Sequence, residues 1–105
     1  MKKQTAGHDR LGDFAPEFAK FNDDILFGEV WSRERQLSEK KRSMITIAAL
    51  MTNGDYEQLQ HHLQHGKDAG ITKEEIVEII TQLAFYVGWP KAWSTFNLAK
   101  EIWKD

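Results

Sequence analysis

The chain has 105 residues, of which 41% are apolar and 29% charged, and its net charge is −2. This length suits one small domain with a single core, and the charge gives no basis for binding nucleic acid. The absence of cysteine excludes disulfides, thiolate metal sites and thiol redox chemistry. No apolar run approaches the roughly 20 residues of a membrane span, and no signal peptide is recognisable, so we expect a cytoplasmic protein.

The N-terminal third of the chain contains one predicted helix. Residues 1–10 are polar and lack periodicity, so we expect a flexible N-terminus followed by one domain over residues 11–105. Over residues 11–25 the apolar side chains recur at helical spacing. Pro16 suits the first turn of this helix, and Gly28 allows a bend after it.

Two further helices are predicted in the middle of the chain. The first begins after Ser38, a good N-cap, and ends at Asn53-Gly54. It is apolar around most of its girth, which indicates a central, buried helix. The next helix runs from about Asp55 to Gly70, because that glycine is well placed to end it.

Two helices complete the predicted all-α fold of about five main helices. Thr72 and Glu75 form a capping box that opens one, and Pro90 suits the first position of the other. No segment has convincing strand periodicity. The chain also has four tryptophans and six phenylalanines, which indicates burial against a second protomer, although a dense monomeric core would explain the same composition.

Three of the four histidines, His61, His62 and His65, lie in the third predicted helix. Leu59 and Leu63 mark its core-facing side, and His62 lies beside them, so we expect it to be half-buried. The residues alone leave open whether it is a satisfied core histidine or lines a pocket. His61 and His65 have the spacing of a helical metal pair. Without a third ligand a solvated face is the simpler interpretation, and we expect no metal.

Three segments of the chain recur together in one known family. They are Phe27-Gly28-Glu29-Val30-Trp31-Ser32-Arg33, then Gln58-Leu59 with His62 and Gly70-Ile71-Thr72-Lys73-Glu74-Glu75-Ile76, and finally Ala84-Phe85-Tyr86-Val87-Gly88-Trp89-Pro90-Lys91-Ala92. In this order and spacing they resemble the carboxymuconolactone decarboxylase family, which has the alkylhydroperoxidase D-like fold. The resemblance implies a helical hairpin core, assembly as a homotrimer or homohexamer, and a pocket near protomer contacts.

Redox members of this family use a Cys-x-x-Cys pair, a histidine on the same helix and a glutamate on the preceding helix. Aligned on Gly70, the resemblance places His62 at the family histidine, Asp55 and Gln58 at the cysteines, and Ser43 at the glutamate. Neither cysteine replacement forms a thiolate or a disulfide. A family-level description as an alkylhydroperoxidase or peroxiredoxin-type enzyme therefore does not fit this chain.

Decarboxylase members of the family also lack the cysteine pair, and they convert 4-carboxymuconolactone to 3-oxoadipate enol-lactone. The resemblance therefore implies a cofactor-free carboxy-lyase or lactone-processing enzyme for a small carboxylated organic acid. Such a site holds the carboxylate, stabilises the negative charge that develops and delivers a proton. His62 is the expected catalytic residue. The expected substrate-binding residues are Arg33 and Arg42 for the carboxylate, Tyr86, Trp31 and Trp89 as walls, and Gln82 and Ser43.

Two positions support an alternative hypothesis. Related small proteins often carry histidine where this chain has Gln82, whose amide cannot exchange a proton near neutral pH. Ser43 likewise replaces a carboxylate of other branches. The alternative is a non-catalytic, oligomeric protein that binds a small molecule on the same fold. Trp31 and Trp89 suit core or interface anchoring equally well.

Overall fold

The computed structural model describes residues 3–105, which contain six α-helices, one π-helical segment and no strand. The all-α prediction is therefore confirmed. None of the helices in this part of the chain is long and apolar enough to cross a membrane. The chain divides into two compact units, Met1–Glu39 and Lys40–Asp105, and the single domain expected over residues 11–105 stays a prediction.

The first unit contains α1 (Ala6–Leu11), α2 (Pro16–Lys20) and the π-helical segment η1 (Phe21–Val30), which pack against one another. The continuous helix predicted over residues 11–25 is wrong, because residues 12–15 interrupt it. Pro16 opens α2, as predicted, and a proline disfavours helical backbone in the residue before it.

Asp23 of η1 holds α1 in place. Its carboxylate accepts hydrogen bonds from the backbone N–H groups of Gly7 and His8, each at 2.9 Å. Hydrogen bonds from the Asn22 side chain and the His8 backbone lower the pKa of Asp23. This contact, 15 or 16 residues away in the sequence, explains why α1 starts within the range 1–10 expected to be flexible. Residues 1–2 of that range lie outside the described residues.

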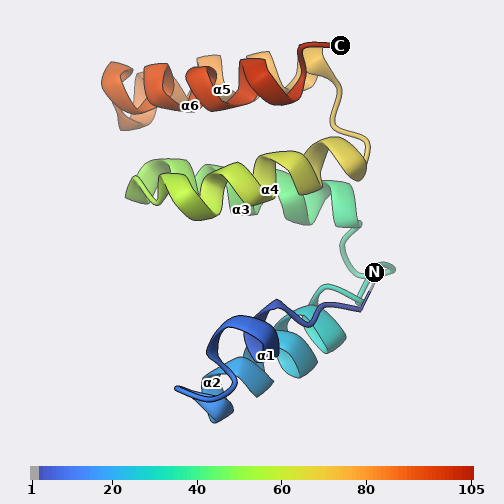
Figure 1. Cartoon of the computed structure of the whole chain (residues 1–105). Coiled ribbons are helices and arrows are strands. Elements are labelled where there is room, and N and C mark those ends of the chain that lie inside the picture. The colour runs from blue at the N-terminus through green and yellow to red at the C-terminus, as the bar shows by residue number, and fades with distance from the viewer. Residues whose placement is uncertain (1–2) are drawn as a thin grey trace. The chain divides into compact units, whose positions relative to one another are not determined.

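The second unit is built from α3 (Glu39–Asn53), α4 (Tyr56–Asp68), α5 (Lys73–Val87) and α6 (Trp89–Ile102). Figure 1 shows them as two layers, with α3 and α4 in one and α5 and α6 in the other. Helix α6 packs against both α4 and α5. Helix α3 begins directly after Ser38 and α4 directly after Asp55, as predicted.

The core of the second unit is formed by side chains from all four helices. Leu59 and Leu63 of α4 are fully buried, which confirms the predicted core-facing side of that helix. Each such side chain contributes about 1.5–3 kcal/mol by leaving water. The other buried members of the core are Ile47, Met51, Ile71, Ile76, Ile80, Ala84, Ala92, Ala99 and Trp103.

The predicted helix ends around α5 are confirmed. The Thr72 hydroxyl accepts the backbone N–H of Glu75 at 3.1 Å, and the Glu75 carboxylate accepts the backbone N–H of Thr72 at 2.9 Å. Gly88 then joins α5 to α6 with a φ of +107°, which glycine adopts without a steric cost. Pro90 stands in the first turn of α6, where its missing N–H has no helical partner to lose.

Lys67 of α4 fastens the C-terminal end of α6. Its ammonium group donates to the backbone oxygen of Ile102 at 2.9 Å and pairs with the carboxylate of Asp105 at 2.7 Å. The last carbonyls of a helix lack helical partners and carry negative partial charge, so a cation there is stabilising. Lys67 therefore joins the two layers at this end of the unit.

We expect Lys67→Met to lower the free energy of unfolding by about 1–2 kcal/mol, because a charged hydrogen bond to a helix end is lost. Lys104→Met is the matched control. Lys104 pairs with Glu101 at 3.7 Å and both side chains are exposed, so its removal should cost less than about 0.5 kcal/mol. Urea denaturation followed by circular dichroism measures both values, and equal losses would contradict the assignment.

Candidate functional site

His62 lies on α4 where the buried side of the helix meets the exposed side, and it is half-buried as predicted. Its ring stacks on that of His65, with centroids 6.2 Å apart and planes inclined by 13°. Burial lowers the pKa of His62 below its ordinary value of 6.5, and the charges of His65 and then His61 lower it further. The neutral imidazole is therefore the main form at pH 7, with one N–H donor and one acceptor nitrogen.

The neighbouring histidines differ from each other in environment. His61 is exposed, whereas His65 is half-buried and stacks on His62. The solvated face expected for both residues therefore describes His61 but not His65, which lies three residues after His62 and is its neighbour on the helix. In residues 3–105 no group of three or more His, Asp or Glu side chains is arranged to hold a metal ion.

An open groove runs between α3 and α5 on the second unit. It has a volume of about 370 Å³ and is mainly apolar. Gln82, one of the predicted substrate-binding residues, contributes an amide to it. We call it the α3–α5 groove, and its lining residues are Met44, Ile45, Ala48, Glu78, Ile79, Gln82 and Leu83. His62 lies on α4, which does not line this groove.

Gln82 is the one groove residue that we predicted from the sequence. A signal for the others was present, because the second predicted helix has apolar residues on more sides than a single buried face requires. Ile45 is an apolar residue outside the buried face of this helix. It is 60% exposed, whereas Ile47, two positions later, is fully buried.

Tyr86 and Trp89 lie on the surface where α5 meets α6. They are 79% and 57% exposed, and their neighbours Phe85 and Trp93 are 77% and 65% exposed. Phe85 and Trp89 contact edge to face, with ring centroids 5.7 Å apart. We call these four residues the aromatic patch. That Tyr86 and Trp89 form walls of a pocket around His62 stays a prediction.

Ser43 and Arg42 are neighbours on α3 with different surroundings. Ser43 is fully buried, on the same side of the helix as Ile47 and Met51. Its hydroxyl has no hydrogen-bond partner among the described residues. Arg42 is half-buried, and its backbone oxygen accepts the hydroxyl of Thr46 at 2.7 Å.

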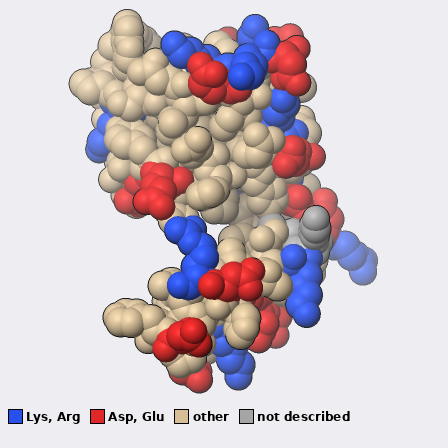
Figure 2. Space-filling view, in the orientation of Figure 1, with Lys and Arg blue, Asp and Glu red and all other residues tan. Residues whose placement is uncertain are grey.

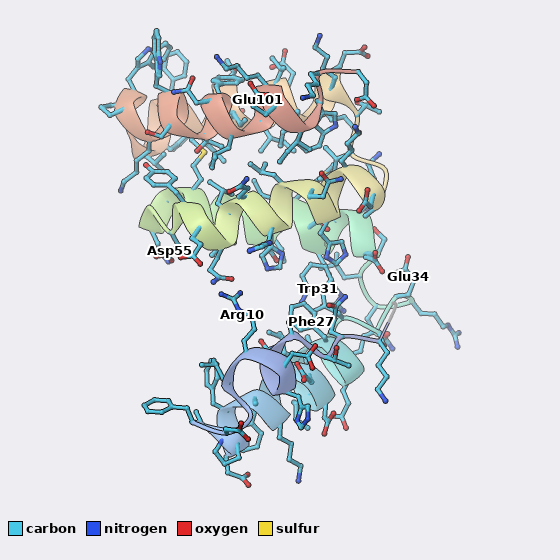
Figure 3. The ribbon with its side chains drawn as sticks, in the orientation of Figure 1. Arg10, Phe27, Trp31, Glu34, Asp55 and Glu101 are labelled. Atoms are coloured by element: carbon cyan, nitrogen blue, oxygen red, sulfur yellow. The ribbon has the colours of Figure 1, made fainter. Side chains whose placement is uncertain are left out.

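Trp31 and Arg33 belong to the first unit, at the end of η1. Trp31 is 5% exposed and stacks on Phe27, with ring centroids 6.1 Å apart and planes inclined by 23°; Figure 3 shows the two rings side by side. The burial favours the core-anchor interpretation of Trp31, in contrast to the exposed Trp89. Arg33 is exposed, and its backbone oxygen accepts the N–H groups of Gln36 and Leu37.

Titration of His62 tests the origin of its lowered pKa. We expect the ring to titrate below 6.5 in an NMR titration of the folded chain. His65→Gln should raise the pKa of His62, because it removes the larger of the two charge effects. His61→Gln should raise it by less. A pKa that stays unchanged or falls in both variants would contradict the assigned causes.

Ser43 provides a test of the buried hydroxyl. We expect Ser43→Ala to leave stability unchanged or raise it by up to about 1 kcal/mol, because the alanine buries no unsatisfied oxygen. Thr95 is the matched control, since it is fully buried but donates to the Lys91 backbone oxygen at 2.8 Å. Thr95→Val should cost about 1 kcal/mol. Thermal and urea unfolding measure both, and a larger loss for Ser43→Ala would show that its hydroxyl is satisfied in solution.

Comparison with known proteins identifies the family to which the chain belongs. The chain is 36% identical over 97 residues to a protein of Acinetobacter baylyi named 4-carboxymuconolactone decarboxylase, covering 92% of this chain and 72% of that protein. It is 30% identical over 84 residues to an uncharacterised 15.0 kDa protein of Paracoccus denitrificans, covering 78% of this chain and 62% of that protein. Residues 16–101 match the carboxymuconolactone decarboxylase family over most of the chain, and the chain belongs to that family.

Proposed function

We propose that this chain is a cofactor-free decarboxylase or lactone-processing enzyme for a small, ring-shaped carboxylic acid. The observation that carries the proposal is the half-buried His62, which burial keeps mainly neutral near pH 7. The relative named 4-carboxymuconolactone decarboxylase supports the same substrate class. The absence of cysteine leaves acid–base and electrostatic chemistry as the means of catalysis.

The site must stabilise one electron pair and supply one proton. As the bond between the carboxyl carbon and the ring carbon breaks, carbon dioxide leaves and the electron pair delocalises into the lactone as an enolate. The N–H of an imidazole ring donates a hydrogen bond to such an oxygen, which stabilises the developing charge. A proton then adds to the ring carbon, and His62 is the proposed donor.

The substrate itself prepares His62 for proton delivery. A carboxylate bound near an imidazole raises its pKa. This effect opposes burial and the charges of His65 and His61, which lower the pKa of His62 in the free chain. Substrate binding therefore favours the protonated form of His62, which can pass its proton to the ring carbon.

The remaining roles in the proposal concern binding. Arg42 or Arg33 is assigned to the substrate carboxylate, because a guanidinium group offers two parallel N–H donors. The other proposed substrate-binding residues are Trp31, Tyr86, Trp89, Gln82 and Ser43. Self-association as a homotrimer or homohexamer is also proposed, and the exposed apolar side chains of α3, α5 and α6 support it.

A second candidate function is small-molecule binding without turnover. The observation that favours it is the character of Ser43 and Gln82, because the first is fully buried and uncharged and the second offers an amide to the α3–α5 groove. Neither side chain exchanges a proton near neutral pH. His62 would then be the sole acid–base group among the proposed site residues that titrates near pH 7.

Turnover of 4-carboxymuconolactone distinguishes the two candidates. We expect the wild-type chain to form the decarboxylated lactone, and His62→Gln to lower kcat by about 10²–10⁴-fold, the usual contribution of a general acid. His61→Gln is the matched control on the adjacent, exposed position, and it should retain most of the activity. Product formation followed by NMR gives the rates.

Each alternative outcome has a definite meaning. A wild-type chain that forms no product but gains thermal stability with the lactone would favour the binding protein, because a ligand of the native state stabilises it. Activity that survives His62→Gln would contradict the role of His62. Consumption of a hydroperoxide with a thiol donor would contradict the exclusion of peroxidase chemistry.

A further inference from the structure

We propose that His65 is a positioning residue for His62, because its ring packs against the His62 imidazole and holds that imidazole in the orientation in which it acts on the substrate. The inference rests on the role of His62 in the proposed function. It adds to that role the residue that orients the proton donor, at a position where the sequence indicated only a solvated face.

The core fixes where the His62 side chain begins but not how its ring is turned. Leu59 and Leu63 are fully buried, so the rotation of α4 determines the position of the His62 Cβ atom. The ring still turns about the Cβ–Cγ bond, and this torsion is broad and roughly two-fold in histidine. A proton donor acts when its nitrogen comes within about 2.6–3.2 Å of the accepting atom. A contact on the face of the ring selects one orientation from this range.

His65 makes such a contact. The centroids of the two rings are 6.2 Å apart and their planes are inclined by 13°, and aromatic pairs have centroid distances of about 4.5–7 Å. Because the planes are nearly parallel, a turn of the His62 ring about its Cβ–Cγ bond tilts it out of the stack. Side chains of a helix lean toward its N-terminus, so the geometry of α4 directs the His65 ring back onto His62.

The backbone that carries His65 is held by the core. Gly66, the next residue, is buried, and a Cβ atom there would lie 2.8 Å from Ile71 Cδ1 and 3.1 Å from Ile47 Cδ1. Ile47 is fully buried and Ile71 is 2% exposed, so α4 meets the core at this residue without spare space. His65 therefore presents its ring to His62 from a fixed position.

The charge pattern of α4 favours packing as the means of orientation. Between Glu57 and Lys67 the helix carries no Asp, Glu, Lys or Arg side chain, and Figure 2 shows an uncharged surface over the middle of α4. A carboxylate or a backbone carbonyl is a common partner that orients an imidazole. The group that α4 itself places beside His62, one turn later, is instead a second imidazole.

His61 provides the internal comparison. Successive residues are rotated by about 100° around a helix axis, so His61 lies about 100° from His62, whereas His65 lies about 60° from it. His61 is exposed and His65 is half-buried. Both neighbours act on His62 through charge, but the ring stack is with His65. Orientation by packing is therefore assigned to His65 and not to His61.

The first test measures the order of the His62 ring and does not require turnover. Carbon-13 relaxation of labelled imidazole rings gives an order parameter for His62. We expect a value above about 0.8 in the wild type and in His65→Phe, which keeps a flat ring in the stack, and below about 0.6 in His65→Ala, the range of a flexible group. His61→Ala is the matched control and should keep the wild-type value. Alanine favours helix, and circular dichroism confirms that each variant remains helical.

The second test measures turnover of 4-carboxymuconolactone. A misplaced proton donor weakens the transition state more than it weakens substrate binding, so His65→Ala should lower kcat by about 10–100-fold while KM changes by less than about 3-fold. His65→Phe should retain kcat within about 3-fold of the wild type, because the ring contact is kept. This rescue separates packing from charge, since phenylalanine carries none. His61→Ala should retain most of the activity.

The outcomes separate the positioning role from the proposed activity. A His62 ring that is equally ordered in the wild type and in His65→Ala overturns the proposal, as does a His65→Phe variant that loses order or kcat as His65→Ala does. A wild-type chain without turnover overturns the proposed function, while the order parameters still decide whether His65 holds the His62 ring. Turnover that His62→Gln abolishes and His65→Ala leaves intact supports the role of His62 and overturns that of His65.

Discussion

The burial of Leu59 and Leu63 is the constraint on which the candidate site depends. Both side chains are fully buried in the core of the second unit, so the rotation of α4 about its axis is fixed. His62 then has one available position, beside the core and half out of water, and His65 follows one turn later. The lowered pKa of His62 is a direct result of this rotation. A helix turned by one residue, about 100°, would place His61 where His62 now lies and would move His62 into the buried position of Leu63.

Local sequence signals predicted the second unit well and the first unit poorly. The capping box of Thr72 and the turn at Gly88 each depend on residues that are close together in the sequence, and the structure contains both. Helix α1 instead depends on Asp23, which lies more than ten residues away. The π-helical segment η1 was also not predicted from the sequence. Its hydrogen bonds reach one residue further than those of an α-helix. Apolar residues spaced by four, such as Phe21 and Ile25, suit either geometry.

The sequence predicted the surroundings of some residues of the candidate site and not of others, and their roles stay predictions. Half-burial of His62 followed from the spacing of two leucines. The exposure of Tyr86 and Trp89 did not follow from any local pattern, because an aromatic residue on a helix is compatible with core, pocket or interface. Which sides of α5 and α6 stay exposed depends on which side chains the two helices bury against each other. This packing is tertiary structure and cannot be read from a local pattern. The groove has the same origin, since it forms where two separately predicted helices meet.

The proposed self-association and the proposed chemistry both involve α5. Gln82 lines the α3–α5 groove, and Tyr86 and Trp89, which are proposed substrate-binding residues, belong to the exposed aromatic patch. An apolar wall that is open to water in a single chain is a poor place to stabilise an enolate, because water screens the charges that would act on it. In the proposed oligomer, a second copy beside the patch would exclude that water. The binding residues of α5 and α6 would then acquire their low-dielectric surroundings from association, whereas His62 has them from the core of its own chain.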